Sequence, residues 1–423
     1  MAQLKAGAGS ARIVFPQELF PHEGFKGIHD DPQVKVLVIE AGEKAAIISA
    51  ELVNIFDDGI EIVKGIVSKT CDVKPENVWV HVTHAITTPH APKTRDEFPP
   101  HIAPPPHMID ESGDKKKAWY DAVTAAFAEA SKQAAVLEDA TMGYVEGTSD
   151  VNTNRDVETP FGWWINLNPD GPSDKALHIV RFNRADGSPL AVMVNYALKP
   201  CAIDNSQMGE NQRLISSDIP GLACRMVEEK LGAPCLFFMS AAGDQVPKDQ
   251  AFLEVVDDEG KVQKDDRGVE YGLKLVEQYG PVLAEDILSA VEQARCGELD
   301  AALRLGGCAF RWGAKGRAPM MPRKSAEYVA EREAEVTSEI ITLGSMAFVA
   351  VKPEVNVVTE KQLQERSPFE TTLLFSMVNG GMKYMPDAQS YERCTWESQS
   401  AMLMPGAAEK WVEETVNALK ALH

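Results

Sequence analysis

Apolar residues follow two spacings along the first third of the chain, one typical of strands and the other of helices. Short apolar runs at 35–42, 44–53 and 78–84 predict strands, the first two paired around a glycine-containing turn. Residues 57–71 have apolar positions at helical spacing, and residues 116–138 form the clearest amphipathic pattern. Strands and helices are therefore expected to interleave.

The same interleaving continues from about residue 141 to the C-terminus. Strands are predicted at 141–152, 176–182, 189–199, 234–244, 302–312, 338–351 and 371–381. Helices are predicted at 218–232, 271–298 and 407–422. Because several strands follow one another directly, we expect an α/β fold with mixed β-sheets flanked by helices instead of a purely parallel, doubly wound sheet.

Four segments lack either spacing and are predicted to be loops. Residues 89–107 hold seven prolines and three histidines, and irregular segments of that length are often functional. The acidic residues 254–268 are expected to form a solvated loop. Residues 151–156 are polar, and residues 159–166 are unusually aromatic for a loop.

Composition narrows the classes of function. The 423 residues carry a net charge of −21, which argues against nucleic acid and against an anionic membrane surface as partners. Seven scattered cysteines without a CxxC pair indicate reduced thiols and a cytoplasmic protein, and neither a secretion signal nor a transmembrane segment is predicted. The chain length is compatible with a homo-oligomer.

Histidines gather where the predicted strand 78–84 ends. The stretch WVHVTHAITTPHAP holds His81, His84 and His90. Because side chains alternate along a strand, His81 and His84 face opposite ways if the strand persists, but His84 and His90 can face one cavity if it ends near residue 83. A catalytic zinc usually has three protein ligands, and this loop offers at most two. A metal site and ordinary polar loop histidines both remain open.

Three further strand ends carry chemistry-bearing residues. Lys199 in NYALKPC is either a surface charge or, if desolvated, an anion binder or general base. Asp244 and Gln245 follow the small-residue turn SAAG, where backbone N–H groups can hold an oxyanion, or which is simply a capped turn. Glu354 in KPEVN is a candidate metal ligand or general base, or an exposed turn residue.

Asn154 and Arg155, in VNTNRD, are candidates for holding a carboxylate or a hydroxyl-bearing substrate, or for a self-capped turn. None of these signals is specific alone. Their shared position at strand ends is more informative, because open α/β sheets bind ligands there.

In order along the chain, these segments resemble the N-terminal catalytic region of the neutral/alkaline, non-lysosomal ceramidase-like family. THAITTPHAP resembles the family's THTHSGP motif, NTNRD its N-x-NR motif, and NYALK its NY-A-x-H strand end. SSDIPG, SAAGDQVPK and KPEVN resemble its helix start, its GAAGD-type turn and its PGE-type motif. The resemblance implies one ceramidase-like layered α/β sandwich over residues 1–423, alternatively divided into lobes 1–140 and 141–423. The family's trailing immunoglobulin-like domain has no counterpart.

The resemblance also implies a zinc amidase. Its ligands would be the first His of THTH, the His of NY-A-x-H, the Glu of PGE and a Tyr near the C-terminus. His84 and Glu354 fill two of these places, so they are the predicted metal ligands. Lys199 stands at the second His place, and Trp396 of CTWES at the Tyr place.

Further departures concern residues outside the ligand set. Ile86 stands at the second His of THTH, and Val246 at the place of a Ser that contributes to catalysis. Two alternatives follow. Zinc is held with help from other residues, of which the candidates are His90, His29, His101 and Asp218. Otherwise the metal is absent, and Lys199 places its charge where the cation would lie. A protonated lysine cannot coordinate zinc and repels it, which favours the second alternative.

We therefore predict a cytoplasmic enzyme that hydrolyses an amide or related bond of a small polar or carboxylated substrate. The predicted catalytic residues are Lys199, Glu354, Asp244 and His84. The predicted substrate-binding residues are Asn154, Arg155, His90, Gln245, Asp218, Tyr384 and Trp396. The alternatives are a metal-independent lyase or isomerase that moves protons between Lys199 and His84 or Glu354, and a non-catalytic binding paralogue. Ceramide is not expected as substrate.

Overall fold

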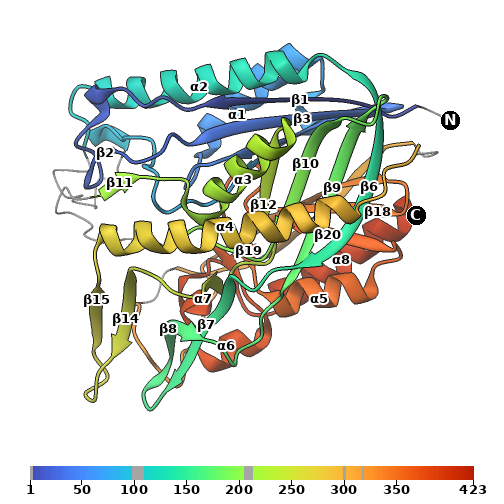
Figure 1. The fold of residues 1–423 in the computed structure, drawn as a ribbon. Coiled ribbons are helices and arrows are strands. Elements are labelled where there is room, and N and C mark those ends of the chain that lie inside the picture. Colours follow the sequence, from blue (N-terminus) through green and yellow to red (C-terminus); the bar gives the residue numbers. More distant parts are fainter. Residues whose placement is uncertain (1–2, 98–108, 204–212, 299–301, 317–318) are drawn as a thin grey trace.

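The structure is a computed structural model that describes residues 3–97, 109–203, 213–298, 302–316 and 319–423. Its centre is a sheet of eight strands (Figure 1). In spatial order these are β12 (Cys235–Met239), β10 (Pro189–Tyr196), β9 (Ala176–Arg184), β6 (Glu138–Thr148), β1 (Lys5–Arg12), β3 (Gln33–Ala41), β4 (Glu43–Ala50) and β5 (Val78–Val82). Neighbours are antiparallel except at the two edges, where β12 runs parallel to β10 and β5 parallel to β4.

A second sheet packs on one face of the first. Its strands are β16 (Arg304–Ala314), β17 (Arg332–Leu343), β18 (Met346–Val351) and β20 (Thr371–Phe375). Strand β3 shows how the packing follows from the sequence. Val36 and Val38 belong to the core on the helix side, whereas Leu37 and Ile39 pack with Phe348 in the core between the sheets. Because side chains alternate, the part of a strand that lies between two apolar cores has apolar residues at consecutive positions.

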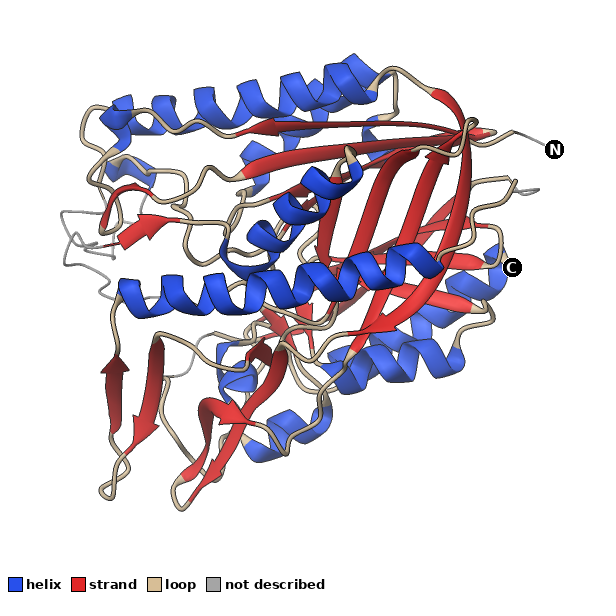
Figure 2. Ribbon diagram, in the orientation of Figure 1, coloured by secondary structure: helices blue, strands red, loops and turns tan. Residues whose placement is uncertain are grey.

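Helices cover the outer faces of both sheets, which gives four layers in the order α/β/β/α (Figure 2). The large sheet is covered by α1 (Asp57–Cys71), α2 (Asp114–Ala134), α3 (Asp218–Leu231) and α4 (Val269–Gln293). The small sheet is covered by α5 (Val357–Arg366) and α8 (Ala407–Leu422). Between α5 and α8 along the chain come the short helices α6 (Ala388–Arg393) and α7 (Trp396–Ser400). This is the mixed α/β architecture expected from the sequence.

Glycines in the first strand let a helix approach its backbone. A Cβ atom on Gly7 would lie 2.3 Å from the carbonyl oxygen of Ala134, and one on Gly9 would lie 2.2 Å from that of Ala130. Both carbonyls belong to α2. The small residues of AGAGS therefore fix how closely α2 packs on β1, because any larger side chain would clash with backbone atoms.

The two edges of the large sheet lie close together. Ser49 of β4 donates a hydrogen bond to the carbonyl oxygen of Phe237 in β12, at 2.6 Å. Residues 376–379, which follow β20, bridge the remaining gap. Ser376 N–H donates to Met239 O of β12, and Val82 N–H of β5 donates to Met377 O. The carboxyl ends of β5 and β10, which are far apart in strand order, are thereby brought to one place.

Three of the segments predicted to be loops, 151–156, 159–166 and 254–268, lie in strands of two hairpins. Residues 151–168 form an antiparallel hairpin of β7 (Asn152–Thr159) and β8 (Gly162–Asn168), to which β13 (Gln245–Pro247) adds. The acidic residues form a second hairpin of β14 (Phe252–Val256) and β15 (Val262–Asp266). Both hairpins extend from the lower left of the body in Figure 1. Charge suggested a solvated loop at 254–268, but the strands of that hairpin are largely exposed and can carry charged side chains. The polar residues 152–156, by contrast, are buried in β7.

The remaining elements are short. They are β2 (Phe25–Ile28), β11 (Arg213–Ile215), β19 (Glu354–Val355), β21 (Tyr384–Met385) and the 3-10 turns Gln17–Leu19, Pro75–Asn77 and Arg95–Glu97. Strands β1 and β6 pair through two residue pairs, Lys5–Asp139 and Ala6–Glu138. The alternative division of the chain into two lobes near residue 140 stays a prediction. Within the described ranges, no helix is long and apolar enough to cross a membrane.

Candidate active site

Four predicted site residues meet at the ends of strands that the chain brings together. His84 lies two residues beyond β5 and has a left-handed backbone with a φ of 61°. Lys199 lies in the Lys199 loop (residues 197–203), which follows β10. Glu354 in β19 and Tyr384 in β21 are directly paired in a short parallel ladder, so their side chains start from adjacent positions.

The side chains of these residues form one connected cluster. The Nζ atom of Lys199 lies 2.6 Å from Oε2 of Glu354 and donates a hydrogen bond to the Tyr384 hydroxyl at 2.9 Å. Nδ1 of His84 lies 3.1 Å from the other carboxylate oxygen, Oε1 of Glu354. One carboxylate therefore contacts an ammonium with one oxygen and an imidazole with the other.

Burial decides the charge states of this cluster. The Glu354 side chain is 1% exposed, and burial would raise its pKa, but Lys199 and then His84 outweigh burial and hold the pKa at about 2. Burial and Arg155 act to lower the pKa of Lys199, yet Glu354 and Tyr384 raise it overall. Burial lowers the pKa of His84, although Glu354 opposes this. At neutral pH the cluster holds an ammonium, a carboxylate and a neutral imidazole.

A second ion pair adjoins the first. Arg155 of β7 donates from Nε to Oε1 of Glu397 in α7, at 2.7 Å, and the Glu397 side chain is fully buried. The Arg155 guanidinium lies 5.4 Å from the ring centre of Tyr384 and 5.1 Å from that of Trp396. The two rings pack edge to face, 5.5 Å apart. Arg155 is thus fixed against the aromatic residues that flank Lys199.

Two cavities open on this cluster. The larger has a volume of about 500 Å³ and is lined by His84, Glu354, Tyr384 and Trp396, together with apolar residues such as Phe56 and charged ones such as Arg213. The smaller, of about 150 Å³, is lined by Lys199, Arg155, Tyr384 and Trp396 among others. Cavities that combine apolar walls with polar groups at defined positions are typical of small-molecule sites.

Three predicted residues lie behind the cluster and line neither cavity. Oδ1 of Asp244 accepts the backbone N–H of Val357 at 3.1 Å, just beyond Glu354. The Asn154 amide donates to Oδ2 of Asp244, and the Gln245 amide donates to Pro172 O. Burial raises the pKa of Asp244 to about 7. Asp244 thus holds the start of α5, three residues after Glu354, and Asn154 holds Asp244.

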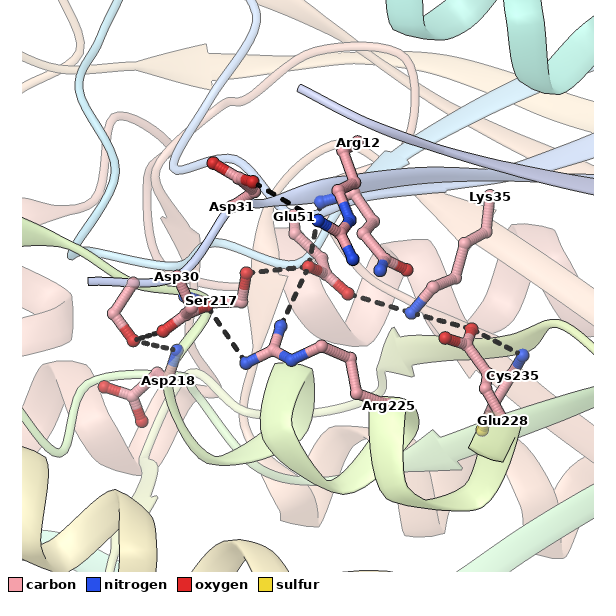
Figure 3. A network of polar contacts seen from close by, with 12 residues as sticks. Arg12, Asp30, Asp31, Lys35, Glu51, Ser217, Asp218, Arg225, Glu228 and Cys235 are labelled. Carbon is pink, nitrogen blue, oxygen red and sulfur yellow. Dashed lines mark hydrogen bonds and ion pairs between the residues drawn. The ribbon is translucent and has the colours of Figure 1, made fainter. Parts of the chain in front are cut away.

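Asp218 also lies away from the cavities. Its carboxylate accepts the backbone N–H groups of Ala202 and Ile203, both at 3.2 Å, and so pins the Lys199 loop. Burial raises its pKa to about 6. Figure 3 shows the buried network beside it, in which Lys35 contacts Glu51 at 2.9 Å and Glu51 accepts from Ser217 at 2.7 Å. Asp218 therefore supports Lys199 through the backbone.

The histidines considered as substitute ligands lie apart from Glu354. His90 lines the large cavity, but its ring contacts Glu23 at 3.2 Å and stacks on Phe56. His29 lines a different cavity, with Asp30 and Arg225. His101 lies outside the described residues. His81, on β5, is fully buried in the core, and its Nε2 accepts from Met239 N–H.

The donor set does not fit zinc. Of the ligands implied by the family resemblance, His84 and Glu354 are in place and Tyr384 brings a hydroxyl, but Lys199 occupies the centre of the set as a protonated ammonium. It has no lone pair for a metal and would repel one. Within the described ranges, no three His, Cys, Asp or Glu side chains are placed to hold a metal ion.

Sequence reasoning missed one contributor to this site and the contact made by another. Glu397 was overlooked, although it follows Trp396 directly in CTWES and a buried Arg155 requires a carboxylate partner. Tyr384, expected only to bind substrate, provides the hydroxyl at Lys199, whereas Trp396, which stands at the family's Tyr place, packs against the Tyr384 ring. The pairing of β19 with β21, which brings Tyr384 beside Glu354, has no local signal because each strand is two residues long.

The fold matches solved ceramidase structures along the whole chain. A ceramidase complexed with C2 has a TM-score of 0.73 at 14% identity, covering 100% of this chain and 75% of that one. The neutral ceramidase from Pseudomonas aeruginosa has a TM-score of 0.72 at 15% identity, with the same coverage. No family model and no curated protein matches the sequence. The expected ceramidase-like layered α/β fold is thereby confirmed.

Proposed function

We propose that this protein is a metal-independent hydrolase that cleaves an amide or related bond of a small molecule. The observation that carries the proposal is the chain Lys199–Glu354–His84, in which one buried carboxylate holds an ammonium and an imidazole side by side at two cavities. An acid and a base placed together are what hydrolysis of a carbonyl compound requires. The fold shared with ceramidases supports amide chemistry.

In this proposal His84 is the general base. Because Nδ1 faces Glu354, Nε2 is the ring nitrogen left for the cavity that His84 lines. The lowered pKa of His84 keeps the ring neutral near pH 7, so that Nε2 can take a proton from a water molecule. Glu354 orients the ring and stabilises the imidazolium that forms, as a buried carboxylate does in a catalytic triad.

Lys199 is the electrophilic group. One N–H of its ammonium is donated to Tyr384 and another faces Glu354, which leaves a third for the carbonyl oxygen of a substrate. Because the Tyr384 oxygen accepts from Lys199, its own hydrogen can be donated to the same carbonyl. Two fixed donors of this kind stabilise the oxyanion of a tetrahedral intermediate, and removing one typically costs about 100- to 1,000-fold in rate.

A lyase or isomerase is the second candidate. It needs the same acid and base but no water, and one observation favours it: Val246, which stands at the family's Ser place, is buried and offers no nucleophile. Product analysis in H₂¹⁸O separates the two candidates. Hydrolysis places ¹⁸O in one product, whereas proton transfer within the substrate places none.

The proposal is tested with a panel of small amides and esters, both uncharged and carboxylated. We expect turnover that is unaffected by chelators and that falls about 100- to 10,000-fold in His84→Asn, the range typical of a lost general base. His29→Asn, which changes a histidine at a distant cavity, is the matched control and should keep full activity. Ligand binding without any turnover across the panel would instead favour a non-catalytic binding protein.

Metal content gives an independent test. The purified protein should contain no stoichiometric zinc, whereas Lys199→His, which removes the ammonium and adds an imidazole beside His84, Glu354 and Tyr384, should gain zinc binding. Lys199→Gln removes the charge without adding a ligand of comparable strength and should bind none. Stoichiometric zinc in the unaltered protein, lost together with activity on chelation, would overturn the metal-independent mechanism.

The expected setting of this enzyme is the cytoplasm, with a small molecule as substrate and without nucleic acid or a membrane as partner. The seven cysteines all lie in described segments and are free thiols there, which supports a reducing compartment. Whether copies of the chain associate remains a prediction that sedimentation can test.

A further inference from the structure

Lys315 is a buried residue that the proposed reaction does not use. It follows the end of β16 directly and is 5% exposed. Burial lowers the pKa of its ammonium to about 8, and no described carboxylate contributes to that value. Lysine is rarely buried this deeply without an acidic partner, because an unpaired charge is costly to bury. The groups that the ammonium contacts therefore indicate its role.

The ammonium caps the C-terminal end of helix α7. Its Nζ atom donates to the carbonyl oxygen of Ala401 at 2.7 Å and to that of Gln399 at 3.4 Å. The backbone N–H of Lys315 donates to Met402 O at 2.8 Å, so backbone and side chain hold the same short segment. The last carbonyls of a helix lack partners within the helix and carry partial negative charge, which a cation stabilises.

Helix α7 is a single turn that depends on contacts outside itself. It has five residues, and the backbone hydrogen bonds at its ends run from Gln399 N–H to Thr395 O at 3.1 Å and from Ala401 N–H to Glu397 O at 2.7 Å. Helices of this length are not stable on their own. The Lys315 cap therefore matters more to α7 than it would to a long helix.

This short helix carries side chains that belong to both cavities. Trp396 lines the large cavity and the small one. Glu397 holds Arg155, which lines the small cavity, and Met402, just beyond the helix, lines the large one. A shift of α7 would therefore move the walls of both cavities together.

We propose that Lys315 is a positioning residue of the active site, whose ammonium fixes α7 and thereby sets where Trp396 and the Arg155–Glu397 pair lie. Lys315 itself lines neither of the two cavities and takes no part in the chemistry. Its effect on catalysis rests on the proposed function, whereas its hold on α7 does not.

The hold should weaken as the pH rises through about 8, where the ammonium loses its proton. A charged donor makes stronger hydrogen bonds than a neutral one, so the neutral amine holds α7 less firmly. The ring of Tyr328 lies 5.3 Å from Nζ, but burial raises its pKa to about 12, so it stays neutral in this range. The other ionisable groups at this place are Tyr391, Cys394, Glu331 and Glu397.

Fluorine NMR of protein labelled with 5-fluorotryptophan follows α7 without requiring turnover. The Trp396 resonance, assigned by its loss in Trp396→Phe, should shift between about pH 6.5 and 9.5 with a midpoint near 8. In Lys315→Met this titration should be absent, and the resonance should keep its high-pH position. Lys324→Met changes an exposed lysine in the loop that carries Tyr328, and this matched control should titrate like the native protein.

Kinetics test the consequence for the site, with a substrate that the amide and ester panel identifies. Above pH 8, KM of the native protein should rise about three- to tenfold while kcat stays level, because α7 shapes the cavities and supplies no reacting group. Lys315→Met should show the raised KM at every pH. Lys315→Arg, which stays charged, should keep the low KM above pH 8 and hold the Trp396 resonance at its low-pH position.

The outcomes separate the hold on α7 from the reaction. A Trp396 resonance that does not titrate, or a titration that persists in Lys315→Met, would overturn the proposal, because another group would then control α7. If Lys315→Met does not fold, a titration that persists in Lys315→Arg has the same meaning. A titrating resonance with an unchanged KM would show that α7 does not position the site. If the titration behaves as expected but the panel shows no hydrolysis, only the proposed reaction fails.

Discussion

Replacing Lys199 by Met should reverse the contribution of Glu354 to the pH dependence of the free energy of unfolding. In the native cluster, the pKa of Glu354 is lowered from its ordinary 4.5 to about 2. A lowered carboxyl pKa stabilises the folded state above pH 4.5, and that stabilisation is lost as the pH falls towards 2. The difference in pKa, at about 1.4 kcal/mol per unit, corresponds to about 3 kcal/mol. Both side chains are buried, so solvent screening reduces this little.

Without the ammonium, burial is the dominant influence on Glu354, and its pKa should rise above 4.5 in the folded protein. The variant should then lose stability as the pH increases through that new pKa, the reverse of the native behaviour. At pH 7 we expect a loss of about 3–5 kcal/mol in the free energy of unfolding, the range typical of a buried ion pair that has lost one partner. The double variant Lys199→Met/Glu354→Gln should recover at least half of this loss.

Urea unfolding followed by tryptophan fluorescence at several pH values between 2 and 8 measures these changes. Lys74→Met, which alters an exposed lysine, is the control and should change stability by less than about 0.5 kcal/mol. If Lys199→Met lowers the free energy of unfolding by less than 1 kcal/mol, and the effects of the two substitutions simply add, Lys199 and Glu354 are not a buried ion pair. The charge states assigned to the cluster would then be wrong.

Three other expectations follow from the same structure. Lys35→Met leaves Glu51 and Glu228 without their shared cation, so unfolding free energy at pH 7 should fall by about 3–5 kcal/mol; a loss under 1 kcal/mol would contradict this. Burial raises the pKa of Glu360 to about 8, so the folded protein keeps a proton that the unfolded chain loses between pH 4.5 and 8. Glu360→Gln should therefore flatten the slope of unfolding free energy against pH in this range, by up to about 1.4 kcal/mol per pH unit. An unchanged slope would refute the raised pKa. Turnover should rise with pH through a pKa below 6.5 and then stay level as His84 loses its proton, which a pH–rate profile can check.

Much of the fold is readable from the sequence because it is locally encoded. The apolar run of residues 36–39 in β3 requires burial on both faces, and the two cores that receive its alternate residues meet that requirement. The acidic hairpin was missed for a local reason as well. Asp257 and Gly260 form a turn in which the aspartate side chain accepts two backbone N–H groups, a signal that the charge of the segment obscured.

The sequence indicates most of the residues of the candidate site, but not how they are arranged. His84, Lys199 and Glu354 each follow an apolar strand, and ligand sites of α/β sheets lie at such ends. Their meeting depends on contacts between distant segments, such as Val82 with Met377, which carry no sequence signal. The sequence also leaves the direction of a side chain open. Asp218 was correctly expected at a helix start, but its carboxylate turns towards the Lys199 loop and away from the cavities.

In the proposed mechanism, Lys199 lies where the family resemblance implies a metal ion, and this changes what the neighbouring groups must do. Glu354 is so deeply buried that it stays ionised only with a positive charge beside it, and the Lys199 ammonium meets that need at 2.6 Å. A metal ion would also lower the pKa of a bound water molecule. An ammonium donates hydrogen bonds but cannot activate water in that way, so the proposed hydrolysis requires a neutral base. His84, held on the same carboxylate and with a lowered pKa, is the described residue placed to perform it.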